Sequence, residues 1–362
     1  MSRIDDFSKP KERIIRARGV SAPNGSRPRS GGASVLPEIV SLFSGAGGLD
    51  LGFKKVGYKI ALAIDSEAAA IYTHRKNFPR TKSIVADLIE LQPQGVVEYV
   101  RSAVPDGRRI AVIGGPPCQG FSRANTSSRA DDPRNQLPKL YLEIVCELQK
   151  FYVVEFIVLE NVLGIRDKKH ATTYKALIDG ISELGFDVNE KELCAADFGV
   201  PQNRRRIVIS GLRKGQGYSS VEPRKRKGID TVREAIGGLR APAYFRSGLK
   251  PDDIPEHPNH WTMQPKSPRF RNPWKQEGGR SFRRLAWDRE SPTIAFGHRE
   301  IHVHPGGHRR LSIYEAMLLQ GFPKRFVLAG NLSEQVQQIS NAVPPPLARS
   351  VASAVTRALD GR

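Results

Sequence analysis

From residue 39 onward, short runs of apolar residues alternate with longer amphipathic stretches. The apolar runs cover residues 39–43, 60–64, 110–114, 156–159 and 207–209. Runs of this length between helical patterns are typical of βαβ units, whose strands form a mostly parallel sheet. We therefore predict an α/β domain over residues 35–213, with its functional loops at the carboxyl ends of the strands.

The pattern changes after about residue 213, where prolines and basic residues become dense and the periodicity is lost until Ser312. The prolines preclude long helices in this interval. All three tryptophans, Trp261, Trp274 and Trp287, also fall here among basic side chains, a mixture that suits phosphate and base contacts. The alternative is a small satellite core with a solvated surface. Residues 214–296 are predicted to form a second, smaller and irregular domain.

Helical character returns at Ser312. Ser312 and Glu315 have the spacing of a capping box ahead of apolar residues 316–319, and Pro323 is expected to stop this helix. A last amphipathic segment runs from about residue 333 to residue 359 and is interrupted by the prolines at 344–346.

Residues 1–34 are rich in Arg, Lys, Gly, Ser and Pro and carry few large apolar side chains. Such a composition does not offset the entropy lost on ordering, so a disordered basic arm is predicted. It lacks the apolar core of a secretory signal. The arm either contacts phosphates nonspecifically or is a solvated tail without function, and both interpretations stay open.

Charge narrows the classes of partner. The chain of 362 residues has 57 Lys and Arg against 37 Asp and Glu, a net charge of +20, which favours nucleic acid ahead of an anionic membrane surface. No stretch approaches the roughly 20 apolar residues of a membrane helix.

The three cysteines are widely spaced, which argues against a disulfide framework or a zinc site and indicates a reducing compartment. Cys146 and Cys194 are expected to be buried.

The first candidate site is the glycine-rich turn at residues 43–50, which follows an apolar run and opens a helix. Its glycines let a ligand approach the backbone, and the helix N-terminus favours an anionic group. The turn lacks the third glycine of a dinucleotide pattern. Asp65 could accept hydrogen bonds from a ribose diol, and Asp87 from an adenine amine. A nucleoside without a pyrophosphate fits best, which indicates S-adenosylmethionine. The alternative is a tight turn with two surface carboxylates.

Three further segments carry candidate chemistry. In residues 114–122, two glycines and two prolines surround Cys118 and form a rigid loop, so we interpret Cys118 as a nucleophile. Glu160 closes an apolar run, where desolvation can raise a carboxyl pKa and suit it to proton donation, although ordinary strand-end residues look the same. Within residues 202–206, Arg204 and Arg206 share one face of a strand and could hold a base carbonyl or a phosphate, whereas Arg205 points away. A solvated charge run is the alternative.

Taken in order, these segments resemble the cytosine-C5 DNA methyltransferases. Residues 43–48 look like the family's first motif, 114–122 like its nucleophile motif, 160–162 like its proton-donor motif and 202–206 like its Gln-x-Arg-x-Arg motif. Residues 310–323 and 338–345 are similar to the ninth and tenth motifs. The resemblance spans residues 39–359 and implies a bacterial enzyme that uses S-adenosylmethionine. It also implies a Rossmann-like sheet, a target-recognition domain at 214–296 and a C-terminal segment, 297–362, that returns to the catalytic domain.

The resemblance implies a role for individual residues. The Cys118 thiolate would add to C6 of a cytosine flipped out of the duplex, Glu160 would protonate or hydrogen-bond N3, and Arg206 with Arg204 would hold O2. The implied cofactor-binding residues are Phe43, Ser44, Gly45, Gly47, Gly48, Asp65, Asp87, Pro116, Leu137, Asn341 and Val343. The implied nucleic-acid contacts are Gln119, Ser122, Gln202, Lys266, Arg269, Arg271, Arg283 and Arg284.

Two positions depart from the family pattern and bear on cofactor affinity. Ser41 stands where Asp often precedes Leu-Phe, and Ser340 stands where Gly often precedes Asn-Ala-Val. The implied partners are double-stranded DNA and a cognate restriction endonuclease that acts on the same site. We expect a monomer in the bacterial cytoplasm, associated with the nucleoid through DNA.

Three other functions stay open. A tRNA cytosine-5 methyltransferase would use the same chemistry, although the long basic interval favours DNA. A non-enzymatic nucleic-acid-binding protein would not need Cys118, Glu160, Gln202 and Arg206 together. A nicotinamide-dependent oxidoreductase would need a pyrophosphate-binding turn, which residues 43–50 do not match.

Overall fold

The computed structural model describes residues 35–117, 136–226, 228, 230–271, 283–293 and 302–361, except for the side chains of Pro251 and Arg269. Residues from Leu36 to the C-terminus belong to one unit. The basic arm predicted at residues 1–34 lies outside the described residues.

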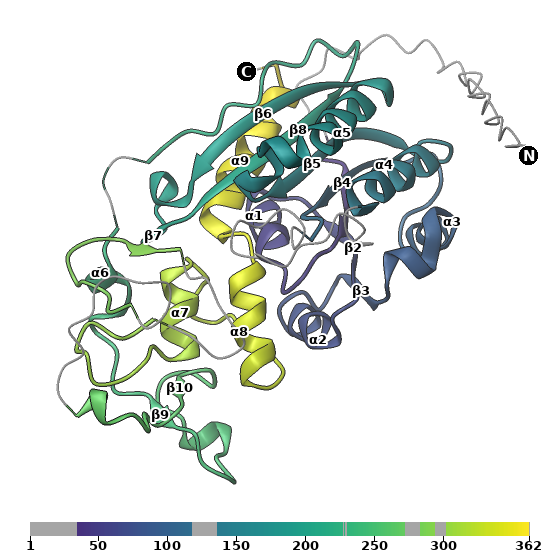
Figure 1. Ribbon diagram of the computed structural model, residues 1–362. Helices are drawn as coiled ribbons and strands as arrows, with labels where there is room; N and C mark the ends of the chain where they lie inside the picture. The colour runs from purple at the N-terminus through teal and green to yellow at the C-terminus, as the bar shows by residue number, and fades with distance from the viewer. Residues whose placement is uncertain are drawn as a thin grey trace, which may run out of the picture. The chain divides into compact units, whose positions relative to one another are not determined.

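A seven-stranded sheet forms the centre of the predicted α/β domain, in the order β3-β2-β1-β4-β5-β8-β6 (Figure 1). Its strands are β1 (Glu38–Leu42), β2 (Ile60–Asp65), β3 (Lys82–Val85), β4 (Arg109–Gly114), β5 (Val153–Asn161), β6 (Phe186–Cys194) and β8 (Arg205–Arg213). The first five strands along the chain pair in parallel, and β8 pairs antiparallel with β5 and with β6. The predicted α/β class is confirmed. The parallel strands all end at one edge of the sheet, where the candidate site residues lie.

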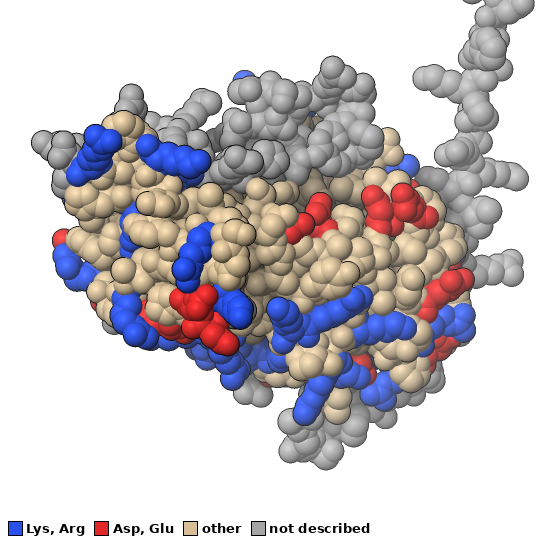
Figure 2. All heavy atoms as spheres, turned by 90° about the horizontal axis from the view of Figure 1, so that it is seen from below, with Lys and Arg blue, Asp and Glu red and all other residues tan. Residues whose placement is uncertain are grey.

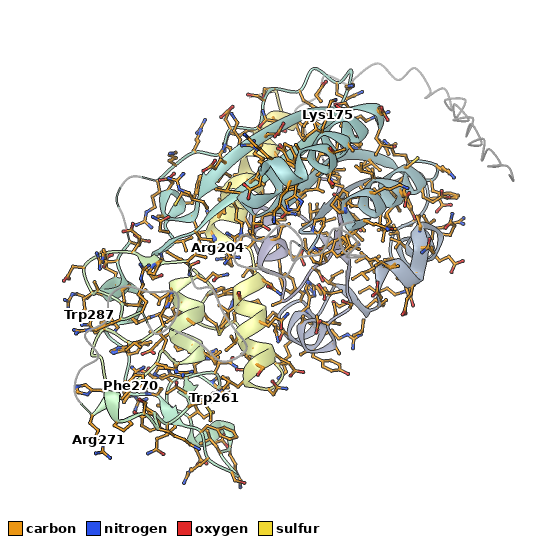
Figure 3. The ribbon with its side chains drawn as sticks, in the orientation of Figure 1. Lys175, Arg204, Trp261, Phe270, Arg271 and Trp287 are labelled. Carbon is orange, nitrogen blue, oxygen red and sulfur yellow. The ribbon has the colours of Figure 1, made fainter. Side chains whose placement is uncertain are left out.

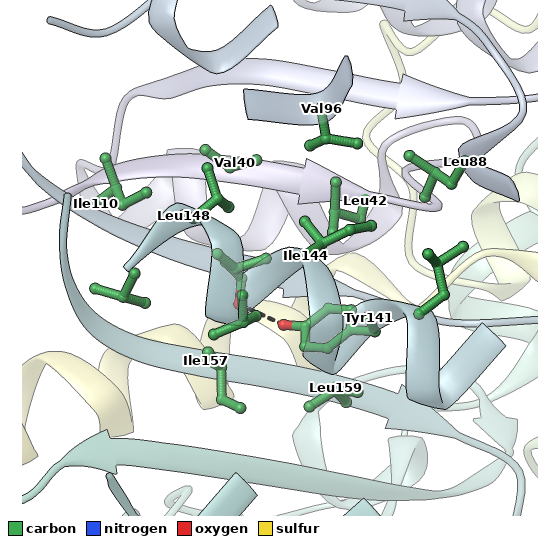
Figure 4. Close-up of a cluster of buried hydrophobic side chains, with 14 of the residues drawn as sticks. Val40, Leu42, Leu88, Val96, Ile110, Tyr141, Ile144, Leu148, Ile157 and Leu159 are labelled. Carbon is green, nitrogen blue, oxygen red and sulfur yellow. Dashed lines mark hydrogen bonds between the residues drawn. The ribbon is translucent and has the colours of Figure 1, made fainter. Parts of the chain in front are cut away.

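Helices cover both faces of this sheet. On one face lie α3 (Leu88–Arg101), α4 (Leu137–Leu148) and α5 (Ala171–Glu183), and on the other α1 (Gly48–Val56) and α9 (Pro345–Leu359). Burial on both faces is the reason why the central strands are nearly continuous apolar runs. Each face carries one cluster of buried apolar side chains. Figure 4 shows the cluster under α3, α4 and α5, in which the Tyr141 hydroxyl of α4 donates to the Val112 carbonyl of β4 at 2.9 Å. Helix α2 (Ala68–Asn77) lies beside β2 and β3.

A third core cluster joins segments on either side of residue 297. Helix α6 (Val232–Ile236) and the side chains of Trp261 and Leu285 share this cluster with α7 (Ile313–Leu319) and α8 (Leu332–Asn341). Helix α9, by contrast, packs on α1. Residues 313–341 therefore share a core with the predicted recognition segment, and α9 completes the sheet domain. The domain boundaries at 214 and 297 stay predictions.

Short elements complete the described structure. Strand β7 (Gln202–Asn203) pairs with β11 (Ser291–Pro292), and β9 (Ala243–Tyr244) pairs with β10 (Trp261–Thr262). Single-turn 3-10 helices are η2 (Leu163–Arg166), η3 (Lys168–His170), η4 (Ala195–Phe198), η5 (Pro251–Asp253) and η6 (Pro268–Phe270). None of the described helices is long and apolar enough to cross a membrane.

Two local signals at the C-terminal helices are confirmed. Ser312 Oγ accepts a hydrogen bond from Glu315 N at 3.0 Å, and Glu315 Oε2 accepts one from Ser312 N at 2.7 Å, which is the predicted capping box. The prediction that Pro323 stops this helix was wrong: α7 ends at Leu319 with Gln320 as its C-cap, and Gly321, with a φ of 77°, turns the chain before the proline is reached. The prolines at 344–346 separate α8 from α9 as predicted.

Residue type alone did not predict correctly which cysteine and tryptophan side chains are buried. Cys146 is exposed and Cys194 is half-buried, so the prediction that both are buried was wrong. Cys146 lies outside the buried face of α4, and helical position decides its exposure. Trp261 is buried and Trp287 packs against the third core cluster, which confirms the packing alternative for these two side chains. Trp274 lies outside the described residues.

Candidate active site

The glycine-rich turn joins β1 to α1 and brings the backbone close to other segments. Gly47 has a φ of 89°, and a Cβ there would lie 2.5 Å from the Phe78 ring. A Cβ on Gly48 would lie 2.3 Å from the carbonyl oxygen of Val343. Phe43 has a φ of 52°, which is uncommon for a residue with a side chain and turns the chain sharply after β1. The structure thus brings the turn and Val343 together, although about 300 residues separate them in the chain.

Asp65 ends β2 and holds this turn. Its Oδ2 accepts a hydrogen bond from Gly45 N at 2.8 Å, and its Oδ1 accepts one from Glu67 N at 2.9 Å. Burial raises the pKa of Asp65, and the two backbone hydrogen bonds oppose that rise. Each carboxylate oxygen has a second lone pair. Asp65 can therefore position the turn and still accept a hydrogen bond from a ligand hydroxyl.

Within the described residues, no side chain caps the N-terminus of α1, where Gly47 is the N-cap. The helix dipole there favours an anionic group. Asp50, in the first turn, is buried instead: its Oδ2 lies 2.9 Å from His74 Nε2, while His74 Nδ1 lies 2.9 Å from Ser83 Oγ. The His74 ring stacks on Phe78 with 4.1 Å between centroids. This network under the turn was missed by sequence reasoning, because no local pattern links residues of two helices and a strand.

Asp87 lies further along the same edge of the sheet. Val85 of β3 is the register partner of Asp65, and Asp87 follows two residues later as the N-cap of α3. Its Oδ1 accepts a hydrogen bond from Ile89 N at 2.8 Å, and the residue is exposed. The structure therefore places Asp65 and Asp87 beyond the ends of adjacent strands, on one side of the glycine-rich turn.

Residues 114–117 lead from β4 into the predicted nucleophile loop. A Cβ on Gly114 would lie 2.5 Å from the Leu42 carbonyl oxygen, so this strand end packs tightly on β1. Asn161 Nδ2 donates to the Pro116 carbonyl at 3.3 Å, which fastens the start of the loop to the end of β5. Cys118, Gln119 and Ser122 lie outside the described residues, and their roles stay predictions.

Glu160 and Arg206 approach each other from the adjacent strands β5 and β8. Glu160 is 7% exposed, and its Oε1 lies 2.9 Å from Arg206 Nε. The opposite charge offsets part of the cost of burying the carboxylate. In the part of the chain that the structure describes, Oε1 has no hydrogen-bond partner of good geometry, so it retains its capacity to bind a substrate. A Cβ on Gly115 would lie 3.5 Å from Glu160 Oε2, so the carboxylate borders the loop that leads to Cys118.

Neighbouring arginines point in opposite directions, as strand alternation predicted. Arg205 is exposed and pairs with Glu192 at 3.0 Å. Arg204 is 2% exposed, and its Nη2 donates to the Ser340 carbonyl at 2.8 Å. Figure 3 shows Arg204 between the sheet and the helices α7 and α8. Arg204 therefore ties the Gln-x-Arg-x-Arg segment to the end of α8, a contact that no local sequence signal could have revealed.

The remaining predicted cofactor residues differ in exposure. Ser44, Pro116 and Leu137 are buried, and Asn341 is exposed at the end of α8. Gln320, which was not singled out as a site residue, is fully buried and donates through Nε2 to the carbonyls of Ile339 at 2.6 Å and Ala342 at 2.7 Å. It fixes the backbone that leads to Val343. The one signal in the sequence was its place within residues 310–323, the segment similar to the ninth motif.

The two departures from the family pattern leave these contacts intact. Ser340 offers Arg204 its backbone carbonyl, which a glycine would offer equally. Ser41 is 1% exposed within β1, and its hydroxyl has no hydrogen-bond partner among the described residues.

The predicted nucleic-acid contacts fall into two groups. Arg283 and Arg284 are half-buried and line a pocket with Asn203, next to the fully buried Gln202. Lys266 and Arg271 are exposed elsewhere, and Figure 3 shows Arg271 well apart from Arg204. The side chain of Arg269 is not described. The structure therefore brings the first group, but not the second, to the segment that carries Arg204, between β7 and β8, and Arg206, in β8.

Sequence comparisons agree with this geometry. The family model for C-5 cytosine-specific DNA methylase matches residues 38–357. The chain is 33% identical over 344 residues to the Type II methyltransferase M1.HphI of Haemophilus parahaemolyticus, a match that covers 88% of this chain and 86% of that protein. It is 32% identical over 347 residues to the Type II methyltransferase M.MthTI of Methanothermobacter thermautotrophicus, covering 90% and 98%.

Solved structures are similar over the same length. A protein described as a DNA modification methyltransferase encoded within an Escherichia coli prophage matches with a TM-score of 0.74 and 26% identity, over 90% of this chain and 100% of that chain. The Dnmt2 methyltransferase of S. pombe matches with a TM-score of 0.60 and 17% identity, over 90% and 98%, which is a likeness of fold.

Proposed function

The chain belongs to the C-5 cytosine-specific DNA methylase family. We propose the following reaction for this DNA cytosine-5 methyltransferase. It takes the methyl group from S-adenosylmethionine and transfers it to C5 of a cytosine flipped out of a specific duplex sequence. The observation that carries the proposal is the buried pair of Glu160 and Arg206, which borders the loop leading to Cys118.

The described residues fit this cofactor. The uncapped N-terminus of α1 suits a carboxylate, Asp65 has lone pairs for ribose hydroxyls, and Asp87 is exposed at the neighbouring strand end for an adenine amine. When bound, the cofactor supplies an electrophilic methyl group. The glycine-rich turn, held by Asp65 and packed against Val343, fixes the position at which that group is presented.

Cys118 supplies the nucleophile that cytosine itself lacks. Its thiolate forms a bond to C6, and the π electron pair of the C5–C6 double bond moves to C5. C5 then bonds to the methyl carbon while the bond between that carbon and the donor's sulfur breaks, and the electron pair of the broken bond stays on that sulfur. A water molecule or hydroxide ion takes the C5 proton, the electron pair of the C5–H bond re-forms the C5–C6 double bond, and the sulfur leaves C6. The thiolate is regenerated, and the ring is again aromatic.

Glu160 and Arg206 stabilise the charge that this addition moves into the ring. Glu160 hydrogen-bonds or protonates N3, and Arg206 donates to O2. With their polar atoms 2.9 Å apart, the two side chains can serve neighbouring positions on one edge of the base. Arg204 acts differently in this proposal, as a positioning residue that holds the Ser340 carbonyl and through it the end of α8.

The proposed substrate is duplex DNA. A base inside the helix cannot reach a buried site, so the target must be extruded at a cost of a few kcal/mol, which pocket and phosphate contacts offset. Lys and Arg side chains are spread over much of the face seen in Figure 2, which supports binding to a polyanion. We infer that the enzyme works on chromosomal DNA in the cytoplasm, beside a restriction endonuclease that cuts the same sequence.

Bisulfite sequencing of DNA from cells expressing the chain tests the proposal. We expect methylated cytosine in one sequence context, and its absence would contradict the proposed substrate.

A duplex with 5-fluorocytosine at that position should form a covalent adduct with the wild-type enzyme in the presence of the cofactor, but not with Cys118→Ser. Glu160→Gln should lower the rate at least about a hundredfold with little change in DNA affinity. Methyl transfer to tRNA but not to DNA would favour the RNA-modifying alternative.

A further inference from the structure

A pocket of about 290 Å³ lies beside β7, just ahead of Arg204 and Arg206, and residues of the recognition segment form most of its lining. Its lining includes Asn203, Arg283, Arg284, Arg289, Glu290 and Thr293. Of these residues, Arg289, Glu290 and Thr293 belong to no motif of the sequence analysis, and Asn203 occupies a variable position of the Gln-x-Arg-x-Arg motif.

Hydrogen bonds between β7 and β11 fix this pocket to the catalytic part. Ser291 N donates to the Pro201 carbonyl at 2.9 Å, and Thr293 Oγ1 donates to the Asn203 carbonyl at 2.7 Å. Ser291 is also the register partner of Gln202. The pocket is therefore held at a constant distance from the Glu160–Arg206 pair, because its wall continues directly into β8.

The lining is strongly basic. Three arginines face one glutamate, so the pocket has a formal charge of +2 from its lining side chains. Arg284 Nε donates to the Pro305 carbonyl at 2.8 Å, which fixes that side chain, whereas Arg289 is exposed. Nearby, His302 has its pKa lowered to about 4 by burial and, to a smaller extent, by the positive charge of Arg283. These features favour an anion.

The position of the pocket relates it to the target base. Asn203 precedes Arg206 by three residues. A fully extended chain rises about 3.3 Å per residue, so this distance is at most about 10 Å. One strand of duplex DNA rises about 3.4 Å per nucleotide, so the pocket lies within about three nucleotides of a base held at Arg206.

We propose that this pocket binds one backbone phosphate of the DNA strand that carries the target cytosine, within about three nucleotides of that base. Arginine presents several donors in a planar fork that matches phosphate oxygens. Among the described lining residues there is no aromatic side chain on which a base could stack. The proposal rests on the proposed function, and it assigns to Arg289 the task of fixing DNA register without reading sequence.

The test compares Arg289→Gln with Arg246→Gln. Arg246 is an equally exposed arginine of the recognition segment that lies near Asp253 and does not line the pocket. Each protein is titrated with a duplex carrying the sequence identified by bisulfite sequencing, by fluorescence anisotropy between about 50 and 200 mM salt. We expect Arg289→Gln to weaken binding about tenfold and to reduce the slope of log affinity against log salt by about 0.9. Arg246→Gln should keep the wild-type slope.

A second measurement identifies the phosphate. Uncharged methylphosphonates replace single phosphates within about three nucleotides of the target, and the affinity of wild type and Arg289→Gln is compared for each duplex. One substitution should weaken wild type about tenfold and the variant less than about twofold. Should Arg289→Gln keep the wild-type slope, respond like wild type at every position, or methylate a relaxed set of sequences, the phosphate assignment is overturned. Failure of the wild-type enzyme to methylate any duplex would instead overturn the proposed function. If Arg289→Gln does not fold, Arg283→Gln is measured in the same way.

Discussion

Replacing His74 with phenylalanine is expected to destabilise the protein by about 1 to 3 kcal/mol or more, the usual cost of leaving a buried polar group without its hydrogen-bond partner. Asp50 and His74 are both fully buried, and their side chains meet at 2.9 Å. Asp50 Oδ1 already has no hydrogen-bond partner among the described residues. Without His74, Oδ2 loses its partner as well, and a buried carboxylate remains uncompensated.

The double variant Asp50→Leu/His74→Phe distinguishes this explanation from a loss of packing. A phenylalanine can keep the stack on Phe78, which now has a centroid distance of 4.1 Å, and a leucine removes the stranded charge. We expect the double variant to regain most of the lost stability, because replacing both partners of a buried pair with apolar residues is often neutral.

Urea unfolding at pH 7, followed by fluorescence and circular dichroism, measures the free energies of the wild type, the two single variants and the double variant. The electrostatic explanation predicts a coupling energy of about 2 kcal/mol or more in this cycle. A His74→Phe variant that loses less than about 1 kcal/mol, or a double variant as unstable as the sum of the two single ones, would refute the reasoning.

Two further predictions follow from the site and its surroundings. Gly48→Ala places a Cβ 2.3 Å from the Val343 carbonyl, so the turn must shift and the dissociation constant for S-adenosylmethionine should rise at least about tenfold by calorimetry. Gly238→Ala is the control, since Gly238 lies outside the left-handed region, as Gly48 does, and has no atom within 4 Å of its Cβ. An unchanged affinity for Gly48→Ala would contradict a tight contact between the turn and Val343. Burial lowers the pKa of His257 and of His302 to about 4, so the unfolded chain binds protons more readily than the folded one below about pH 6.5. Stability should therefore fall as the pH drops from about 6.5 towards 4, by up to roughly 3 kcal/mol per histidine, and urea midpoints that do not change across this range would exclude the effect.

Local rules accounted for much of the fold. The apolar runs at residues 39–43 and 110–114 predicted parallel strands, and the structure has β1 and β4 there. The capping box at Ser312 and the proline break before α9 were also readable, because each signal lies within a few residues. Strand β6 escaped notice since most of its side chains are polar and only partly buried at the sheet edge, so apolar periodicity is weak there.

By itself, the sequence determined which segments carry chemistry and that they follow strands, because periodicity, turn residues and motif spacing act over short stretches of chain. Only the tertiary structure decided which of these groups meet: Arg204 at the Ser340 carbonyl, Glu160 against Arg206, and His74 beneath the glycine-rich turn. It also decided which arginines gather beside the catalytic strand and which lie elsewhere. Such contacts join residues tens to hundreds of positions apart, and they depend on how helices and strands pack around a common core rather than on any local pattern.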